Sequence, residues 1–149
     1  MATAERVRVL HVENDPYDAA QVAAALRRAP FPCEVTVVDG RAKLVAALAQ
    51  GAWDIALLDY AMPFLNVAEA IAILRAHAPG LPYVIVSGKL PFVLDNPDTA
   101  SLADPVWQAL KLGRVDYVSK YNLTRLGAVL EANLRGARTP PAPGTRRAP

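Results

Sequence analysis

The stretch that most constrains the fold is Trp53–Pro63, with the sequence WDIALLDYAMP. Its apolar residues run together from Ile55 to Leu58 and are followed at once by Asp59. A short apolar run between turn residues is typical of a strand covered on both faces, as in a parallel sheet. The stretch predicts a strand over 53–58, with Asp59 at the edge where open α/β sheets place functional residues. Taken alone, an Asp in this place is more often a structural residue that ends a strand.

The rest of the chain alternates between the two-residue period of strands and the helical period. Further strands are predicted at 6–12, 33 to about 39, 83–86 and 115–119. Helices are predicted at 16–28, 41–50, 67–77, 105–112 and from 123 onward. Five strands that alternate with helices predict an α/β fold, a doubly wound parallel sheet with helices on both faces.

Composition excludes several classes of protein. The chain has 149 residues, of which 53% are apolar and 20% charged, as expected of one globular domain. The net charge of +2 comes from the last segment, which has four arginines and no acid, so it does not predict a nucleic-acid-binding domain. Cys33 is the only cysteine, which excludes an intrachain disulfide. Because no apolar run approaches the roughly 20 residues of a membrane span, and the start lacks a signal sequence, we expect a cytoplasmic protein.

Two segments fall outside the regular pattern. Residues 89–104 contain prolines and no clear period, and we expect a long loop there between the fourth strand and the fourth helix. Loops of this length are uncommon in compact domains and are usually functional or mobile. Residues 136–149 are rich in Pro and Arg, and we expect a disordered tail after a folded domain at 1–135.

Polar residues follow four of the five predicted strands: Glu13 and Asn14, then Asp59, Ser87 and Lys120. Right-handed crossovers bring the carboxyl ends of parallel strands to one edge, so these side chains should lie close together. Carboxylate, amide and hydroxyl oxygens suit Mg²⁺, and a lysine can pair with a phosphoryl oxygen. A carboxylate can also be a nucleophile that forms an aspartyl-phosphate. The set therefore indicates a site for phosphoryl transfer.

Four motifs resemble, in order and spacing, those of the receiver domain of two-component response regulators. They are VENDP (12–16), LDYAMP (58–63), VSG (86–88) and DYVSK (116–120). The resemblance covers about residues 7–134 and implies the flavodoxin-like receiver fold, with five strands in the order 2-1-3-4-5.

The resemblance implies a role for each residue of the predicted site. Asp59 would accept the phosphoryl group, and Lys120 would pair with it. Mg²⁺ would lie among Glu13, Asn14, Asp59 and the backbone carbonyl of Ala61. The resemblance further implies a stand-alone receiver in a phosphorelay that signals by protein–protein contact. It implies no enzyme activity beyond the chain's own phosphorylation and dephosphorylation.

A switch and a set of partners are also implied. Ser87 would hydrogen-bond the phosphoryl group and move toward it, and Tyr117 would then turn inward. The phosphoryl donor would be a histidine kinase or a phosphotransfer protein, and the output a downstream protein that the sequence does not identify. We expect no nucleic-acid or membrane partner, and a homodimer stays open.

Three departures from the family pattern leave alternatives open. Asn14 replaces an acid, which predicts weaker Mg²⁺ binding unless Asp15 compensates, and we expect Asp15 to cap a helix instead. Phe64 and Tyr121 add bulk near the mouth of the site, and the loop at 89–104 is unusually long. The alternative function is a phosphorylation-independent pseudo-receiver that acts as a protein-binding module. A phosphohydrolase is disfavoured, because Ala61 stands where its general acid would be.

Overall fold

The computed structural model describes residues 6–60, 62–63, 65–88 and 115–138. In this part of the chain, five parallel strands form one sheet in the order β2-β1-β3-β4-β5. The strands are β1 (Val7–Val12), β2 (Cys33–Val38), β3 (Ile55–Leu58), β4 (Tyr83–Ser87) and β5 (Asp116–Ser119). The predicted doubly wound fold and its strand order are therefore confirmed.

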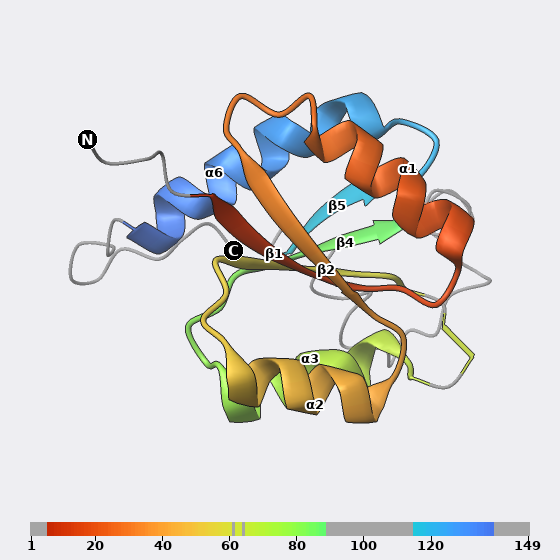
Figure 1. Cartoon of the computed structure of the whole chain (residues 1–149), viewed down its shortest axis with the longest axis vertical. Helices are drawn as coiled ribbons and strands as arrows, with labels where there is room; N and C mark the ends of the chain where they lie inside the picture. Colours follow the sequence, from red (N-terminus) through yellow and green to blue (C-terminus); the bar gives the residue numbers. More distant parts are fainter. Residues whose placement is uncertain (1–5, 61, 64, 89–114, 139–149) are drawn as a thin grey trace.

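Helices cover both faces of the sheet (Figure 1). On one side lie α1 (Pro16–Leu26) and α6 (Leu126–Arg138), which follows the short 3₁₀ helix η2 (Leu123–Arg125). On the other side lie α2 (Arg41–Gln50) and α3 (Val67–His77). Each layer encloses its own apolar core, and β3 is buried along its whole length between the two. An apolar run buried on both faces is what the central strand of a parallel sheet requires.

Side-chain alternation divides β1 between these two cores. Leu10 and Val12 pack in the core on the side of α2 and α3, whereas Val7 and Val9 pack in the core on the side of α1 and α6. Successive side chains of a strand point to opposite faces, so one strand serves both layers. The strand also carries its next residue, Glu13, to the carboxyl edge of the sheet.

Two helices begin at side-chain caps. The Asp15 carboxylate accepts a hydrogen bond from the amide of Tyr17, with an oxygen-to-nitrogen distance of 2.9 Å. Asn66 does the same for the amide of Glu69, at 2.8 Å. These caps satisfy amides that have no partner within the helix. The cap predicted at Asp15 is thus present, and its carboxylate is committed to starting α1.

Two element boundaries lie two residues from their predicted positions. β3 begins at Ile55 rather than Trp53. The indole of Trp53 instead donates to the carbonyl of Ala47 at 3.0 Å, and the guanidinium of Arg8 lies 4.5 Å from the centre of its ring. Helix α1 ends at Leu26, two residues early.

Helix α6 continues through Gly136 to Arg138, so the tail expected from residue 136 is still helical at its start.

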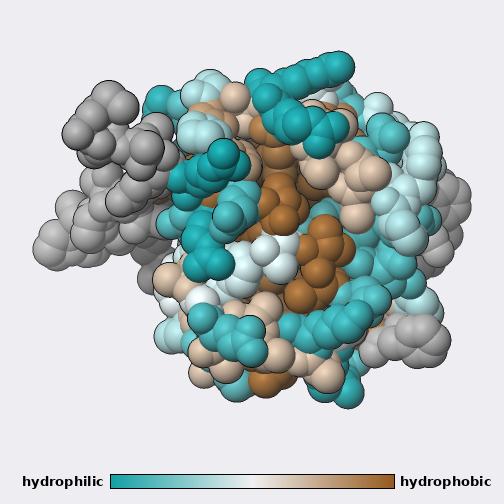
Figure 2. Space-filling view, in the orientation of Figure 1, coloured by the Kyte–Doolittle hydropathy of each residue, from teal (hydrophilic) through white to brown (hydrophobic). Residues whose placement is uncertain are grey.

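The predicted loop at 89–104, the predicted helix at 105–112 and residues 139–149 lie outside the described residues. Within the described ranges, none of the helices has the length and apolar character to cross a bilayer. Figure 2 shows hydrophobic side chains along the edge of the sheet between the helix layers, where β2 lies and where Val37 is 43% exposed.

Candidate functional site

A cleft of about 450 Å³ lies at the carboxyl edge of the sheet. Residues at the ends of β1, β3, β4 and β5 line it together with the start of α1 and the segment before α6: Glu13, Asn14, Asp15, Tyr17, Asp18, Gln21, Asp59, Ser87, Gly88, Lys120, Tyr121 and Leu123. The structure thus brings together the polar residues that the sequence placed at strand ends. Their convergence follows from the parallel sheet, which aligns the strand ends on one edge.

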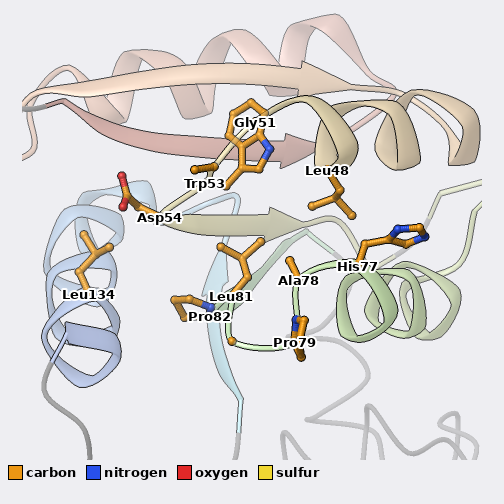
Figure 3. Close-up of a pocket in the computed structure, with 12 residues that line it drawn as sticks. Leu48, Gly51, Trp53, Asp54, His77, Ala78, Pro79, Leu81, Pro82 and Leu134 are labelled. Carbon is orange, nitrogen blue, oxygen red and sulfur yellow. The ribbon is translucent and has the colours of Figure 1, made fainter.

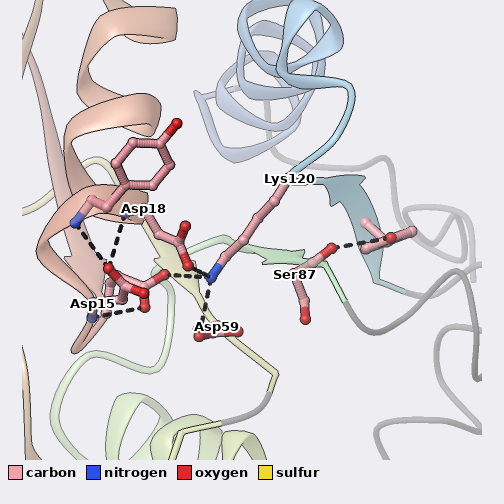
Figure 4. A network of polar contacts seen from close by, with 8 residues as sticks. Asp15, Asp18, Asp59, Ser87 and Lys120 are labelled. Atoms are coloured by element: carbon pink, nitrogen blue, oxygen red, sulfur yellow. Dashed lines mark hydrogen bonds and ion pairs between the residues drawn. The ribbon is translucent and has the colours of Figure 1, made fainter.

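Lys120 is at the centre of this cleft (Figure 4). Its ammonium nitrogen lies 2.9 Å from Oε1 of Glu13 and 3.3 Å from Oδ2 of Asp59. The shortest of its contacts, 2.7 Å, is to Oδ2 of Asp18 in the first turn of α1. One cation therefore links the residues that follow β1 and β3, and the first turn of α1, to the end of β5.

These charges are mostly withdrawn from water. The Glu13 side chain is fully buried, and the side chains of Asp59 and Lys120 are 6% and 15% exposed. Burial raises the pKa of Glu13, and the charge of Asp59 adds to this, against the hydrogen bond from Lys120. Burial alone would lower the pKa of Lys120, but its bonds to Asp18 and Glu13 and the charge of Asp59 raise it above the usual value. Lys120 is therefore protonated at neutral pH.

Asp18 is a member of the site that was not predicted from the sequence. An acid in the first turn of a helix has a sufficient local explanation, since it interacts favourably with the helix dipole. The signal that could have found Asp18 is its position. Only three residues separate the end of β1 from the start of α1, so the first turn of α1 must lie beside the carboxyl edge.

The residues next to Glu13 have different roles. The amide of Asp15 donates to Oε2 of Glu13 at 3.2 Å and fixes this buried carboxylate. Asn14 is exposed and lines the cleft. The carboxylate of Asp15 caps α1, where its Oδ1 accepts from the amides of Tyr17 and Asp18.

The donor atoms fit a hard divalent cation. Glu13 and Asp59 present carboxylate oxygens to one cationic group, which shows that both face the same point. Mg²⁺ usually takes one or two carboxylates and keeps several waters. Among the described residues, no group of three or more His, Cys, Asp and Glu side chains forms a metal site by itself. An ion here would therefore need water and other oxygens, such as the amide of Asn14. Ala61 lies outside the described residues.

Ser87 and Tyr117 lie on neighbouring strands. Ser87 is buried at the end of β4 and lines the cleft. The Tyr117 hydroxyl donates to the backbone carbonyl of Ser87 at 3.2 Å, and its side chain is half-buried. The predicted switch pair is thus in direct contact, with the aromatic ring partly turned into the protein.

Two tyrosines flank the mouth of the cleft. Tyr17 and Tyr121 are 70% and 85% exposed. The ring of Tyr121 lies over Gly88, so that a side chain at position 88 would meet the ring at 3.4 Å. Tyr121 therefore adds bulk at the mouth as predicted, while Phe64 lies outside the described residues.

A second cavity, of about 410 Å³, lies at the opposite edge of the sheet (Figure 3). Leu48, Trp53, Leu81 and Leu134 form apolar walls around it. Among the described residues that line it, Asp54 is the only Asp or Glu, and Oδ2 of this residue accepts a hydrogen bond from the amide of Arg8 at 2.9 Å. The two acids that flank β3 thus have separate environments: Asp54 ties β1 to the start of β3, and Asp59 faces Lys120.

Comparison with known proteins agrees with this geometry. No protein-family model matches the chain. The protein-glutamate methylesterase/protein-glutamine glutaminase 2 of Caulobacter vibrioides is 30% identical over 121 residues, which cover 81% of this chain and 32% of that protein. The chain thus spans about a third of the length of this curated relative.

Solved structures show the same fold. A response regulator receiver domain protein from Methanospirillum hungatei has a TM-score of 0.68 and 20% identity, over 90% of this chain and 98% of that one. The receiver domain of a sensor histidine kinase from Pseudomonas aeruginosa, with magnesium coordinated in its active site cleft, has a TM-score of 0.64 and 20% identity, over 89% of this chain and all of that one. The chain therefore has the receiver-domain fold, and the resemblance predicted from its sequence is confirmed.

Proposed function

We propose that this chain is a receiver in a two-component phosphorelay and that Asp59 accepts the phosphoryl group. The observation that supports this most is the contact of Asp59 with Lys120 inside a cleft at the carboxyl edge of a receiver fold. Phosphoryl transfer depends mainly on positioning and on neutralising charge. A carboxylate held beside a buried ammonium group meets both requirements.

Each residue of the cleft would have its own role in phosphoryl transfer. The Asp59 carboxylate attacks the phosphorus atom of a phosphohistidine or a small phosphodonor, an aspartyl-phosphate forms, and the bond to the leaving group breaks. Lys120 neutralises charge on the transferred group. Ser87 lies at the end of the next strand and would donate a hydrogen bond to it. This reaction is the chain's own phosphorylation. Hydrolysis of the aspartyl-phosphate by water, which restores the Asp59 carboxylate and releases inorganic phosphate, is the chain's own dephosphorylation.

Mg²⁺ is the cofactor that this donor set favours. Glu13, Asn14 and Asp59 would hold it, together with the backbone carbonyl of Ala61 and water. Bound there, it would offset the repulsion between the buried carboxylates and the incoming phosphoryl oxygens. Asn14 supplies an oxygen without a charge, so we expect weaker binding than with an acid in its place.

The output would be a change of surface near β5. Ser87 and Tyr117 are already linked through the hydrogen bond between the Tyr117 hydroxyl and the Ser87 carbonyl. A shift of Ser87 toward a phosphoryl group would therefore act directly on Tyr117. The partners would be a histidine kinase or phosphotransfer protein and a downstream protein, with the chain in the cytoplasm.

A phosphoryl mimic tests this proposal. Beryllium fluoride binds carboxylates as a phosphoryl group does, and fluorine NMR detects the bound form. We expect a Mg²⁺-dependent bound signal with wild type and none with Asp59→Asn. Asp54→Asn is the matched control, because Asp54 lies at the other end of the same strand and should leave the signal unchanged. Equal signals from wild type and Asp59→Asn would show that Asp59 is not the acceptor.

The pseudo-receiver is the second candidate, and a specific observation favours it. The exposed amide of Asn14 stands where an acid would help to bind the metal. In that case the chain would bind its partner equally well with and without the mimic. A change of tenfold or more in partner affinity when the mimic is bound excludes this alternative.

A further inference from the structure

The contact between Asp18 and Lys120 lies outside the roles that the receiver resemblance assigns. The ammonium group of Lys120 has three carboxylate neighbours, and the nearest is Asp18, at 2.7 Å, rather than the phosphoacceptor Asp59, at 3.3 Å. Glu13 lies between these values at 2.9 Å. Figure 4 shows the side chain of Lys120 reaching from the end of β5 toward the first turn of α1. Its resting place is thus set largely by a residue of a helix.

Asp18 differs from the other two carboxylates in its access to water. Its side chain is 28% exposed, whereas that of Glu13 is fully buried and that of Asp59 is 6% exposed. An acid that reaches water loses little when its partner leaves, because water solvates it in place of the lysine. Of the three contacts of Lys120, the ion pair with Asp18 therefore costs the least free energy to break.

We infer that Asp18 is a positioning residue that holds Lys120 in the resting state and competes with the acceptor for it. This inference rests on the proposed function. A phosphoryl group on Asp59 brings more than one negative charge and three acceptor oxygens. It attracts Lys120 more strongly than the single charge of Asp18 does. Lys120 then moves from Asp18 to the phosphoryl group, and the first turn of α1 loses its link to β5.

The position of Asp18 suits such a release. It lies in the first turn of α1, where the cap at Asp15 holds the helix start independently of Lys120. The helix therefore stays formed when the ion pair breaks, and only the contact across the cleft changes. The carboxylate of Asp18 is then free to face the cleft mouth beside Tyr17.

Competitive acetylation with acetic anhydride tests the resting state without any phosphorylation. Lysines held in ion pairs react slowly, because the amine must first leave its partners. In EDTA, we expect Lys120 of wild type to react more slowly than exposed Lys43. In Asp18→Asn, we expect Lys120 to react about fivefold faster than it does in wild type. Asp18→Glu should restore slow reaction, since it returns a carboxylate to the same turn. Asp18→Ala provides a second neutral variant that favours helix.

The control is another acid–lysine pair of the same chain. Asp39 lies 3.0 Å from Lys43 on the surface, and Asp39→Asn should leave the reaction of Lys120 unchanged. Lys120 reacting at its wild-type rate in both neutral variants, or as fast as Lys43 in wild type, would overturn the inference. Because this measurement needs neither metal nor phosphodonor, it gives its answer even where Asp59 fails to bind the mimic.

Discussion

Removal of His11 should flatten the dependence of stability on pH. His11 lies in the middle of β1, is fully buried, and has no hydrogen-bond partner for either ring nitrogen among the described residues. Burial lowers the pKa of its imidazole to about 4, and the positive charge of Lys120 acts in the same direction. The folded protein therefore keeps His11 neutral over a pH range in which the unfolded chain binds a proton.

The sign and the size of the change in unfolding free energy follow from the difference between the two pKa values of His11. The ordinary pKa of 6.5 applies to the unfolded chain, and the value of about 4 applies to the folded protein. As pH falls from about 6.5 to about 4, the unfolded state binds a proton that the folded state does not bind, so the folded protein loses stability. Below this range both states bind the proton, and the loss stops growing. Between about pH 7 and about pH 5, this single group should cost about 2 kcal/mol of unfolding free energy.

Urea denaturation followed by circular dichroism measures this loss. We expect wild type to lose about 2 kcal/mol more than His11→Leu between about pH 7 and about pH 5, in EDTA throughout. The comparison uses the pH dependence alone, so any packing defect of the variant cancels. His77→Leu is the matched control, because it removes an exposed histidine from the same chain. An equal loss of unfolding free energy between these two pH values for wild type and His11→Leu would refute the reasoning.

Three further substitutions test other parts of the account. Lys120→Met leaves two buried carboxylates without their cation and should cost about 3 kcal/mol in urea unfolding, against about 0.5 kcal/mol or less for Lys43→Met on the surface; equal losses would contradict the burial argument. Asn14→Asp adds a charge to the cleft and should tighten Mg²⁺ binding about tenfold by calorimetry; an unchanged affinity would remove Asn14 from the metal site. Asp15→Ala removes a helix cap and should cost about 1 kcal/mol of stability, where no loss would mean that the cap is dispensable.

The fold could be predicted from the sequence because its signals are local. The apolar run from Ile55 to Leu58 and the change of period between strands and helices depend only on neighbouring residues. The boundaries depended on distant contacts instead. The sequence pattern predicts Trp53 as part of a strand, but its ring packs against Arg8 of another strand. The sequence pattern at Gly136 indicates the start of a tail, but the helix continues through it to Arg138.

The site could be predicted only as far as topology determines it. Glu13, Asp59 and Lys120 follow strands, and a parallel sheet places strand ends together whatever the details of packing. The contact between Asp18 and Lys120 joins residues 102 positions apart and depends on how one lysine side chain lies. No period or motif encodes such a choice, and the position of Asp18 in a first helical turn offers a simpler explanation. The structure was needed to show which acid lies nearest the lysine.

The most direct test of the account is intact-mass spectrometry after incubation with a small phosphodonor such as acetyl phosphate. Wild type, Asp59→Asn and Asp54→Asn are each measured with and without Mg²⁺. The account predicts an added mass of one phosphoryl group on wild type and on Asp54→Asn, only with Mg²⁺, and no added mass on Asp59→Asn. Wild type that stays unmodified at high Mg²⁺, or Asp59→Asn that is still modified, would contradict it.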